Sequence, residues 1–142
     1  MAMVEMALRE AAQAEPQEAR PASIADIAAA QQLSAAYLEQ LFGRLRRAGL
    51  VESARGPGGG YRLATTPARI SIAAIIEAVD EPISATRCEA GHVGCLAGER
   101  CTTHDLWAEL GDQIRLFLAG VTLADVLAGQ VAGRAAAPLP AR

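Results

Sequence analysis

Apolar residues recur along residues 34–49 with the period of an α-helix. They form one continuous face, which consists of Leu38, Leu41, Phe42 and Leu45. Ser34 stands where an N-cap residue is expected, and Gly49 stands where a helix commonly ends. The pattern therefore predicts an amphipathic helix that starts after Ser34 and stops before Gly49.

A shorter helix is predicted immediately before this one. Ser23 and Asp26 have the spacing of a capping box, and apolar residues follow at helical intervals up to about Gln32. Residues 1–13 predict a first helix, and its apolar face is made of Met3, Val4, Ala7 and Leu8. A loop through Pro16 and Pro21 follows that first helix. The second and third helices, joined by a tight turn, predict a helix-turn-helix.

A β-hairpin is predicted next. Residues 50–55 and 61–64 have the composition of strands, and they flank Gly56-Pro57-Gly58-Gly59-Gly60, which is too rich in glycine for anything but a turn. A hairpin that follows a helix-turn-helix is a wing. The fold class is accordingly predicted as mainly α with a small β-hairpin, that is, a winged helix-turn-helix with a long C-terminal dimerisation helix.

Three helices are predicted in the second half of the chain. Ser71 caps one of them, a long helix begins near Thr103, and Thr122 caps a last short one. The long helix carries a seam of apolar residues suited to pairing with a second copy: Trp107, Leu110, Ile114, Phe117 and Val121. The predicted organisation is a winged helix-turn-helix domain over residues 1–80, a loop with all the cysteines over 81–104, the dimerisation helix and terminal helix over 105–130, and a disordered tail over 131–142.

Composition narrows the class of protein. The chain has 142 residues, 51% of them apolar, which suffices for the core of one domain. Its opening stretch has neither a basic leader nor a long apolar run, so we predict a cytoplasmic protein without a membrane span. The net charge of -3 disfavours nucleic acid, but residues 44–62 hold five arginines and only one carboxylate, Glu52. This local positive patch suits a phosphate backbone.

The helix-turn-helix supplies candidate contacts to a double-stranded DNA operator. Its second helix would enter the major groove, with Ser34 and Tyr37 near a phosphate and with Gln40 and Arg44 at base edges. Glu39 would accept from a cytosine amine and act in selection. The remaining candidates are Arg47, Arg55 and Arg62 for phosphate, with Gly58 in the wing. The same residues also fit a solvated surface or a protein contact.

All three cysteines, Cys88, Cys95 and Cys101, lie in one short glycine-rich stretch that ends at His104. An odd number of cysteines in a reducing compartment indicates metal binding or redox chemistry rather than disulfides. These ligands suit zinc, copper(I) or an iron-sulfur cluster. His92 is an alternative fourth ligand, and the competing interpretations are inert thiols, a structural zinc or a surface histidine.

Four motifs carry a resemblance that runs from about Met3 to Gly129. They are Tyr37-Leu38-Glu39-Gln40-Leu41-Phe42, Arg55-Gly56-Pro57-Gly58-Gly59-Gly60-Tyr61, Ala78-Val79-Asp80-Glu81 and Cys101-Thr102-Thr103-His104-Asp105-Leu106-Trp107. In these the chain resembles the iron-sulfur cluster regulators, within a family of small winged-helix repressors. The resemblance implies a homodimeric transcription factor whose long C-terminal helices cross. It also implies a 2Fe-2S cluster held by Cys88, Cys95, Cys101 and His104.

The implied function is control of iron-sulfur cluster-assembly genes, with the cluster-assembly machinery as the cluster donor. Glu39 matches the family position that is linked to the choice of operator. Two alternatives stay open: a related winged-helix regulator that senses nitric oxide or redox state, and a structural zinc protein without DNA binding. An enzyme is not expected, because the chain shows no set of nucleophile, base and orienting residue.

Overall fold

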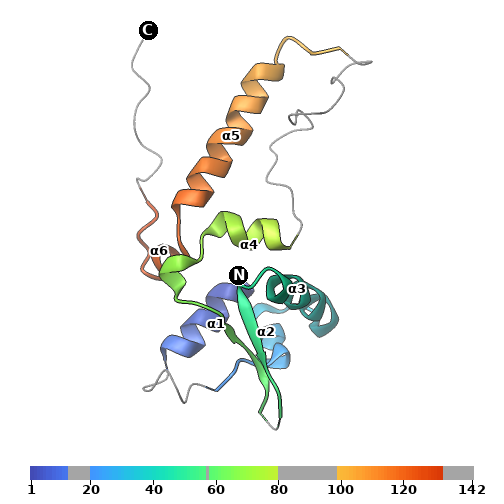
Figure 1. Cartoon of the computed structure of the whole chain (residues 1–142), viewed down its shortest axis with the longest axis vertical. Coiled ribbons are helices and arrows are strands. Elements are labelled where there is room, and N and C mark those ends of the chain that lie inside the picture. Colours follow the sequence, from blue (N-terminus) through green and yellow to red (C-terminus); the bar gives the residue numbers. More distant parts are fainter. Residues whose placement is uncertain (13–19, 57, 80–98, 133–142) are drawn as a thin grey trace.

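The computed structural model describes residues 1–12, 20–56, 58–79 and 99–132 of the chain. Its elements in chain order (Figure 1) are α1 (Ala2–Ala11), α2 (Ile24–Gln31), α3 (Ala35–Arg47), β1 (Val51–Ala54), β2 (Gly60–Leu63), the short 3-10 helix η1 (Pro67–Arg69), α4 (Ile72–Ala78), α5 (His104–Gly120) and α6 (Leu123–Leu127). This architecture confirms the predicted fold class of mainly helical structure with one hairpin. Most of the predicted cluster loop and of the tail lies outside the described residues, Cys88, His92 and Cys95 included.

The core of the N-terminal body is built where α1, α2, α3 and the hairpin meet. Its largest fully buried side chains include Phe42, Met6, Ile27 and Leu38. The apolar face predicted for α1 was partly wrong, because Leu8 is 50% exposed whereas Met6 is fully buried. The helix is therefore rotated so that Met3, Met6 and Ala7 face the core.

Side-chain caps set the start of the two helices of the helix-turn-helix. The Ser23 hydroxyl accepts a hydrogen bond from Asp26 N at 3.1 Å, and the Ser34 hydroxyl accepts one from Tyr37 N at 3.2 Å. Each bond satisfies a backbone N–H that the first turn of a helix leaves without a partner. Between the helices, Gln32 takes the left-handed conformation at φ 54°. The serines thus define the tight turn that the sequence predicted.

The hairpin is joined to the start of α2. β1 and β2 pair antiparallel, with Val51 opposite Leu63 and Ala54 opposite Gly60. Ala22 N also donates to Tyr61 O at 2.8 Å, and Tyr61 N donates back to Ala22 O at 2.9 Å. These two bonds hold the segment before α2 against the second strand. The wing is thereby joined directly to the helix-turn-helix.

This close approach predicts a strong effect of substituting Gly60. A Cβ at Gly60 would lie 2.3 Å from Ala22 O, a backbone atom. We expect Gly60→Ala to lower the free energy of unfolding by about 1–3 kcal/mol, the usual cost of overpacking. Gly43→Ala is the control, because a Cβ there meets nothing within 4 Å and α3 should gain about 0.5–1 kcal/mol. Urea denaturation measures both, and equal midpoints for the two variants would contradict the prediction.

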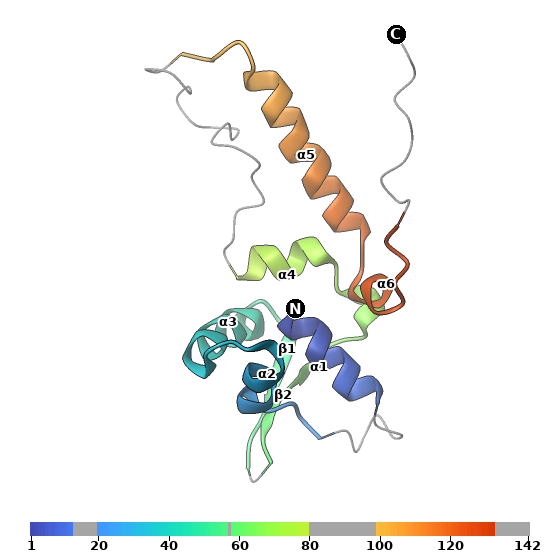
Figure 2. The same cartoon turned by 180° about the vertical axis from the view of Figure 1, so that it is seen from behind.

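α4 lies between this body and α5 in both views (Figure 1, Figure 2), and the hairpin projects from the opposite end of the molecule from the start of α5. The Ser71 hydroxyl caps α4 by accepting from Ala74 N at 3.1 Å. Ile72 N donates to Val121 O at 2.9 Å, and Leu123 N donates to Ile70 O at 2.8 Å. The end of α5 and the start of α6 are therefore bound to the backbone around the start of α4.

These bonds correct one part of the predicted apolar seam. Val121 was assigned to the seam, but α5 ends at Gly120, and Val121 is extended and only 2% exposed. It is buried within the protomer and is not available to a second copy. The exposed part of the seam is at the other end of the helix, where Trp107 is 39% and Leu110 is 40% exposed.

Candidate nucleic-acid interface and metal ligands

The second helix of the helix-turn-helix has one face in the core and one face in solvent. Leu38, Phe42 and Leu45 are buried on the inner face of α3. The predicted contact residues of its N-terminal half are all exposed: Ser34, Tyr37, Glu39 and Gln40. A helix that is anchored on one side and polar on the other can enter a groove without disturbing its own packing.

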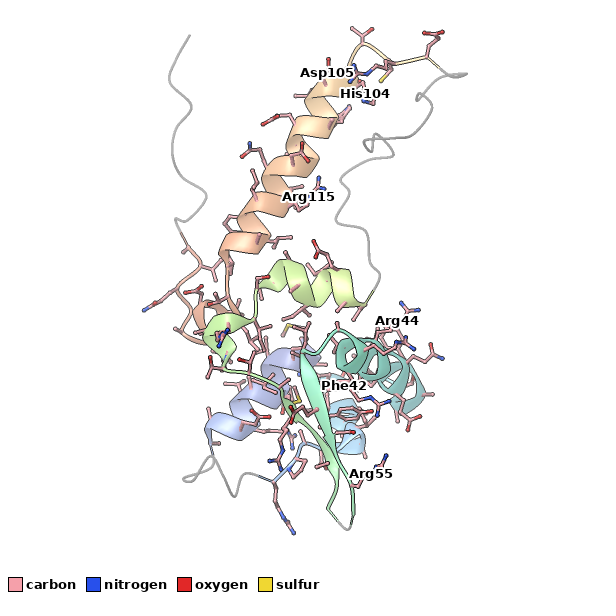
Figure 3. All side chains as sticks on the ribbon, viewed as in Figure 1. Phe42, Arg44, Arg55, His104, Asp105 and Arg115 are labelled. Atoms are coloured by element: carbon pink, nitrogen blue, oxygen red, sulfur yellow. The ribbon has the colours of Figure 1, made fainter. Side chains whose placement is uncertain are left out.

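The wing presents a second set of predicted contacts. Arg55 and Gly58 are exposed, and Figure 3 shows Arg55 at the end of the molecule from which the hairpin projects. Arg47 is exposed in the last turn of α3. Arg62 differs from these, since it is half-buried on β2 and stands opposite Glu52 in the strand register. The structure thus brings α3 and the hairpin together as one surface, with Arg62 toward its inner side.

Arg44 was predicted to meet base edges, and the structure gives it a partner within the protein. Its Nη1 donates at 2.6 Å to the backbone carbonyl of Val79, the C-cap residue of α4. The side chain is half-buried, unlike that of Arg47 one turn away. Sequence reasoning missed this contact because the two residues are 35 positions apart and nothing in either local pattern marks the pair.

A second contact that the sequence did not reveal joins α1 to the wing. The Glu10 carboxylate accepts a hydrogen bond from Leu63 N at 2.7 Å. A hydrogen bond to a charged acceptor is stronger than a neutral one. The only local signal was that Glu10 lies in the last turn of α1, where a carboxylate is unfavourable without such a partner.

Two of the four predicted metal ligands lie in the described residues. His104 is the first residue of α5, and Cys101 lies in the turn before it. His104 N donates to Cys101 O at 3.0 Å, so both side chains belong to one turn of backbone. Each side chain is half-buried, and Cys101 Sγ lies 3.6 Å from Thr103 Oγ1. Figure 3 shows His104 and Asp105 at the end of α5 farthest from the winged helix.

This donor pair fits a metal centre, although it is not sufficient alone. A thiolate and an imidazole are ligands for zinc, copper or iron. The start of a helix favours negative charge, which a ligating thiolate carries. Among the residues with described positions, no three histidine, cysteine or acidic side chains converge on one point. A complete site therefore needs further ligands, and the sequence supplies Cys88 and Cys95.

The fold and this surface define a class, the winged-helix transcriptional regulators. The model of one family, Rrf2, described as iron-dependent transcriptional regulators, matches residues 2–129. The chain belongs to the Rrf2 family. This membership confirms the resemblance that the motifs carry, and it supports the prediction that the chain is a regulator and not an enzyme.

Curated relatives bear the same kind of name. The chain is 51% identical over 110 residues to the HTH-type transcriptional regulator IscR of Yersinia enterocolitica, which covers 78% of this chain and 66% of the relative. It is 50% identical over 107 residues to IscR of Aliivibrio salmonicida, covering 75% of this chain and 63% of that one. The chain thus spans just under two thirds of the length of these relatives.

Solved structures share the fold. CymR, the global cysteine regulator of B. subtilis, is 35% identical with a TM-score of 0.68, and the match covers 89% of this chain and 88% of CymR. IscR of T. potens is 34% identical with a TM-score of 0.67, covering 90% of this chain and 79% of that one. Separately, none of the helices in the described ranges is long and apolar enough to cross a membrane.

Proposed function

We propose that the chain is a DNA-binding transcriptional regulator that reads an operator through α3 and the wing. The observation that carries the proposal is the polar, exposed half of α3, which lies beside the projecting hairpin and is joined to it by the contact of Phe42 with Tyr61. In this proposal Gln40 and Glu39 contact base edges, while Arg47 and Arg55 contact phosphates. Membership of a family of transcriptional regulators supports this assignment.

The proposed assembly is a homodimer formed through α5. Leu106, Trp107 and Leu110 are 63%, 39% and 40% exposed on this helix. These three large apolar side chains lie on adjacent turns of one helix, and leaving them in water is unfavourable in free energy. A second copy of α5 would cover them and present two helix-turn-helix units to one operator.

The proposed cofactor is a 2Fe-2S cluster held by Cys88, Cys95, Cys101 and His104. The cluster would supply a redox-responsive and labile centre, and a histidine in place of one thiolate raises the reduction potential. Cys101 and His104 would hold it at the start of α5, on the helix proposed to form the dimer. The family description of iron-dependent regulators supports iron rather than zinc. The genes that the protein regulates would be those of cluster assembly. The cluster-assembly machinery in the cytoplasm would donate the cluster.

Salt dependence tests the DNA interface. The probe is a duplex operator selected by the wild-type protein from a random pool, and binding is titrated by fluorescence anisotropy at several salt concentrations. We expect a steep loss of affinity with salt and two chains per operator. Arg55→Ala should reduce the slope of log K against log salt by about 2 per dimer, which is one phosphate contact in each protomer.

Arg115→Ala is the control for the loss of one positive charge. Arg115 is exposed on α5 (Figure 3) and pairs with Asp112. Its removal should leave the salt slope unchanged. Binding that ignores salt, or an equal effect of Arg55→Ala and Arg115→Ala, would refute the proposed interface.

A further inference from the structure

The hydrogen bond from Arg44 to Val79 O links α3, the helix proposed to enter the major groove, to the end of α4. Val79 is the C-cap residue directly after α4, and the carbonyls at the end of a helix have no partner within it and carry partial negative charge. A guanidinium that donates to such a carbonyl gives it a hydrogen-bond partner and places a positive charge beside its partial negative charge. α4 has only seven residues, so its last turn depends on contacts of this kind.

The bond also directs Arg44 away from the exposed face of α3. A half-buried, charge-assisted hydrogen bond of 2.6 Å from Nη1 to Val79 O holds the guanidinium toward α4 and away from the exposed face of α3. Figure 3 places Arg44 at the side of α3 nearest to α4, whereas Glu39 and Gln40 are exposed. In this structure the Arg44 side chain makes a contact within the protein and is half-buried.

Val79 has a particular place in the chain. It immediately precedes residues 80–98, in which the sequence puts Cys88 and Cys95. α4 also packs against α5, which starts at His104, and lies between α3 and α5 in both views (Figure 1, Figure 2). The carbonyl that accepts from Arg44 on α3 therefore belongs to the last residue before the segment that contains Cys88 and Cys95.

We propose that Arg44 is a positioning residue that couples α3 to the cysteine-bearing segment through Val79 O, and that it does not read a base. The inference rests on the proposed function, since Arg44 would link the cysteine-bearing segment to α3, the helix proposed to bind the operator. A displacement of the backbone at residue 79 would be passed to α3 through this bond. Loss of the bond would weaken the link between the two parts, which would keep only the packing of α3 against α4.

Operator titrations distinguish this role from a DNA contact. The variants are Arg44→Met, which removes the donor, Arg44→Lys, which keeps one donor but not the fork, and Arg47→Met, which removes an exposed arginine from the same turn of α3. We expect Arg44→Met to weaken binding about tenfold while its salt slope and its preference at every operator position stay those of the wild type. Arg44→Lys should recover most of the affinity, because an ammonium can also donate to one carbonyl.

The contrasting results are equally definite. Arg47→Met should lower the salt slope by about 1 per protomer, as a phosphate contact does. If Arg44→Met behaves in the same way, or if Arg44→Met and Arg44→Lys both lose discrimination at one base pair, Arg44 contacts DNA and the inference is overturned.

Hydrogen exchange without DNA separates the link from the proposed function. Amides of residues 76–79 should exchange about tenfold faster in Arg44→Met than in the wild type, and at the wild-type rate in Arg47→Met. Unchanged exchange in Arg44→Met overturns the inference even if the protein binds its operator. Faster exchange together with no salt-dependent DNA binding by the wild type would uphold the link and refute the proposed function instead.

Discussion

Replacing Phe42 by alanine is expected to remove about 3–5 kcal/mol from the free energy of unfolding. Phe42 is fully buried, and its ring centroid lies 4.9 Å from that of Tyr61 at an interplanar angle of 53°. It joins α3 to the second strand, so its removal leaves a cavity at the junction of the helix-turn-helix and the wing. A domain has only about 5–15 kcal/mol of stability in total, so this loss is a large fraction of it and the urea midpoint should fall sharply.

Tyr37→Ala is the matched control for loss of an aromatic residue from the same helix. Tyr37 is 44% exposed, and substitutions at such positions usually change stability by about 0.5 kcal/mol or less. Urea denaturation followed by far-ultraviolet circular dichroism compares the two. A Phe42→Ala midpoint equal to that of Tyr37→Ala would show that the junction does not depend on this ring.

Local sequence signals were sufficient for the elements that their own residues define. The serines at positions 23, 34 and 71 each accept a hydrogen bond from the backbone N–H three residues later, as their spacing predicted. The apolar period gave α3 its buried face because each turn repeats the same requirement. The glycines of the wing predicted the turn, since Gly56 and Gly58 have positive φ values of 105° and 78°.

Contacts between distant segments were not predictable in this way. Whether Leu8 or Met6 faces the core depends on which helix packs against α1, and both residues are apolar. Val121 continued the helical period of the seam, but the backbone bond with Ile72 draws it into the core beyond the end of α5. Arg44 had the composition and position of a base-reading residue, and only the three-dimensional arrangement shows its bond to Val79 O. Periodicity thus predicts faces, and it does not determine which neighbour each face meets.

The candidate metal site shows the same limit. The sequence predicted a long helix that begins near Thr103, and in the structure His104 begins this helix while Cys101 lies in the turn before it. The start of this helix could be predicted because its signals are local, and the bond from His104 N to Cys101 O joins the two residues in one turn of backbone. The roles of Cys88, Cys95 and His92 lie outside the described residues and remain predictions.

Replacing Cys101 by serine is expected to abolish cluster binding. A thiolate binds iron far better than a hydroxyl, which stays protonated at neutral pH, so the variant would keep at most two of the three sulfur ligands. Wild-type protein prepared without oxygen should be brown. It should contain about two iron and about two acid-labile sulfide ions per chain, which corresponds to one 2Fe-2S cluster. Cys101→Ser should be colourless, with little iron and with the same affinity for the operator whether or not iron and sulfide are supplied.

Variants of the two histidines then identify the fourth ligand. His104→Ala should lose most of the visible absorption, while His92→Ala should keep it. His104→Cys should keep a cluster with a lower reduction potential, because a thiolate donates more negative charge to iron than a neutral imidazole does. Circular dichroism should show that each variant is folded. A colourless wild type with one zinc per chain, or loss of the signal in His92→Ala and not in His104→Ala, would overturn the proposed ligand set.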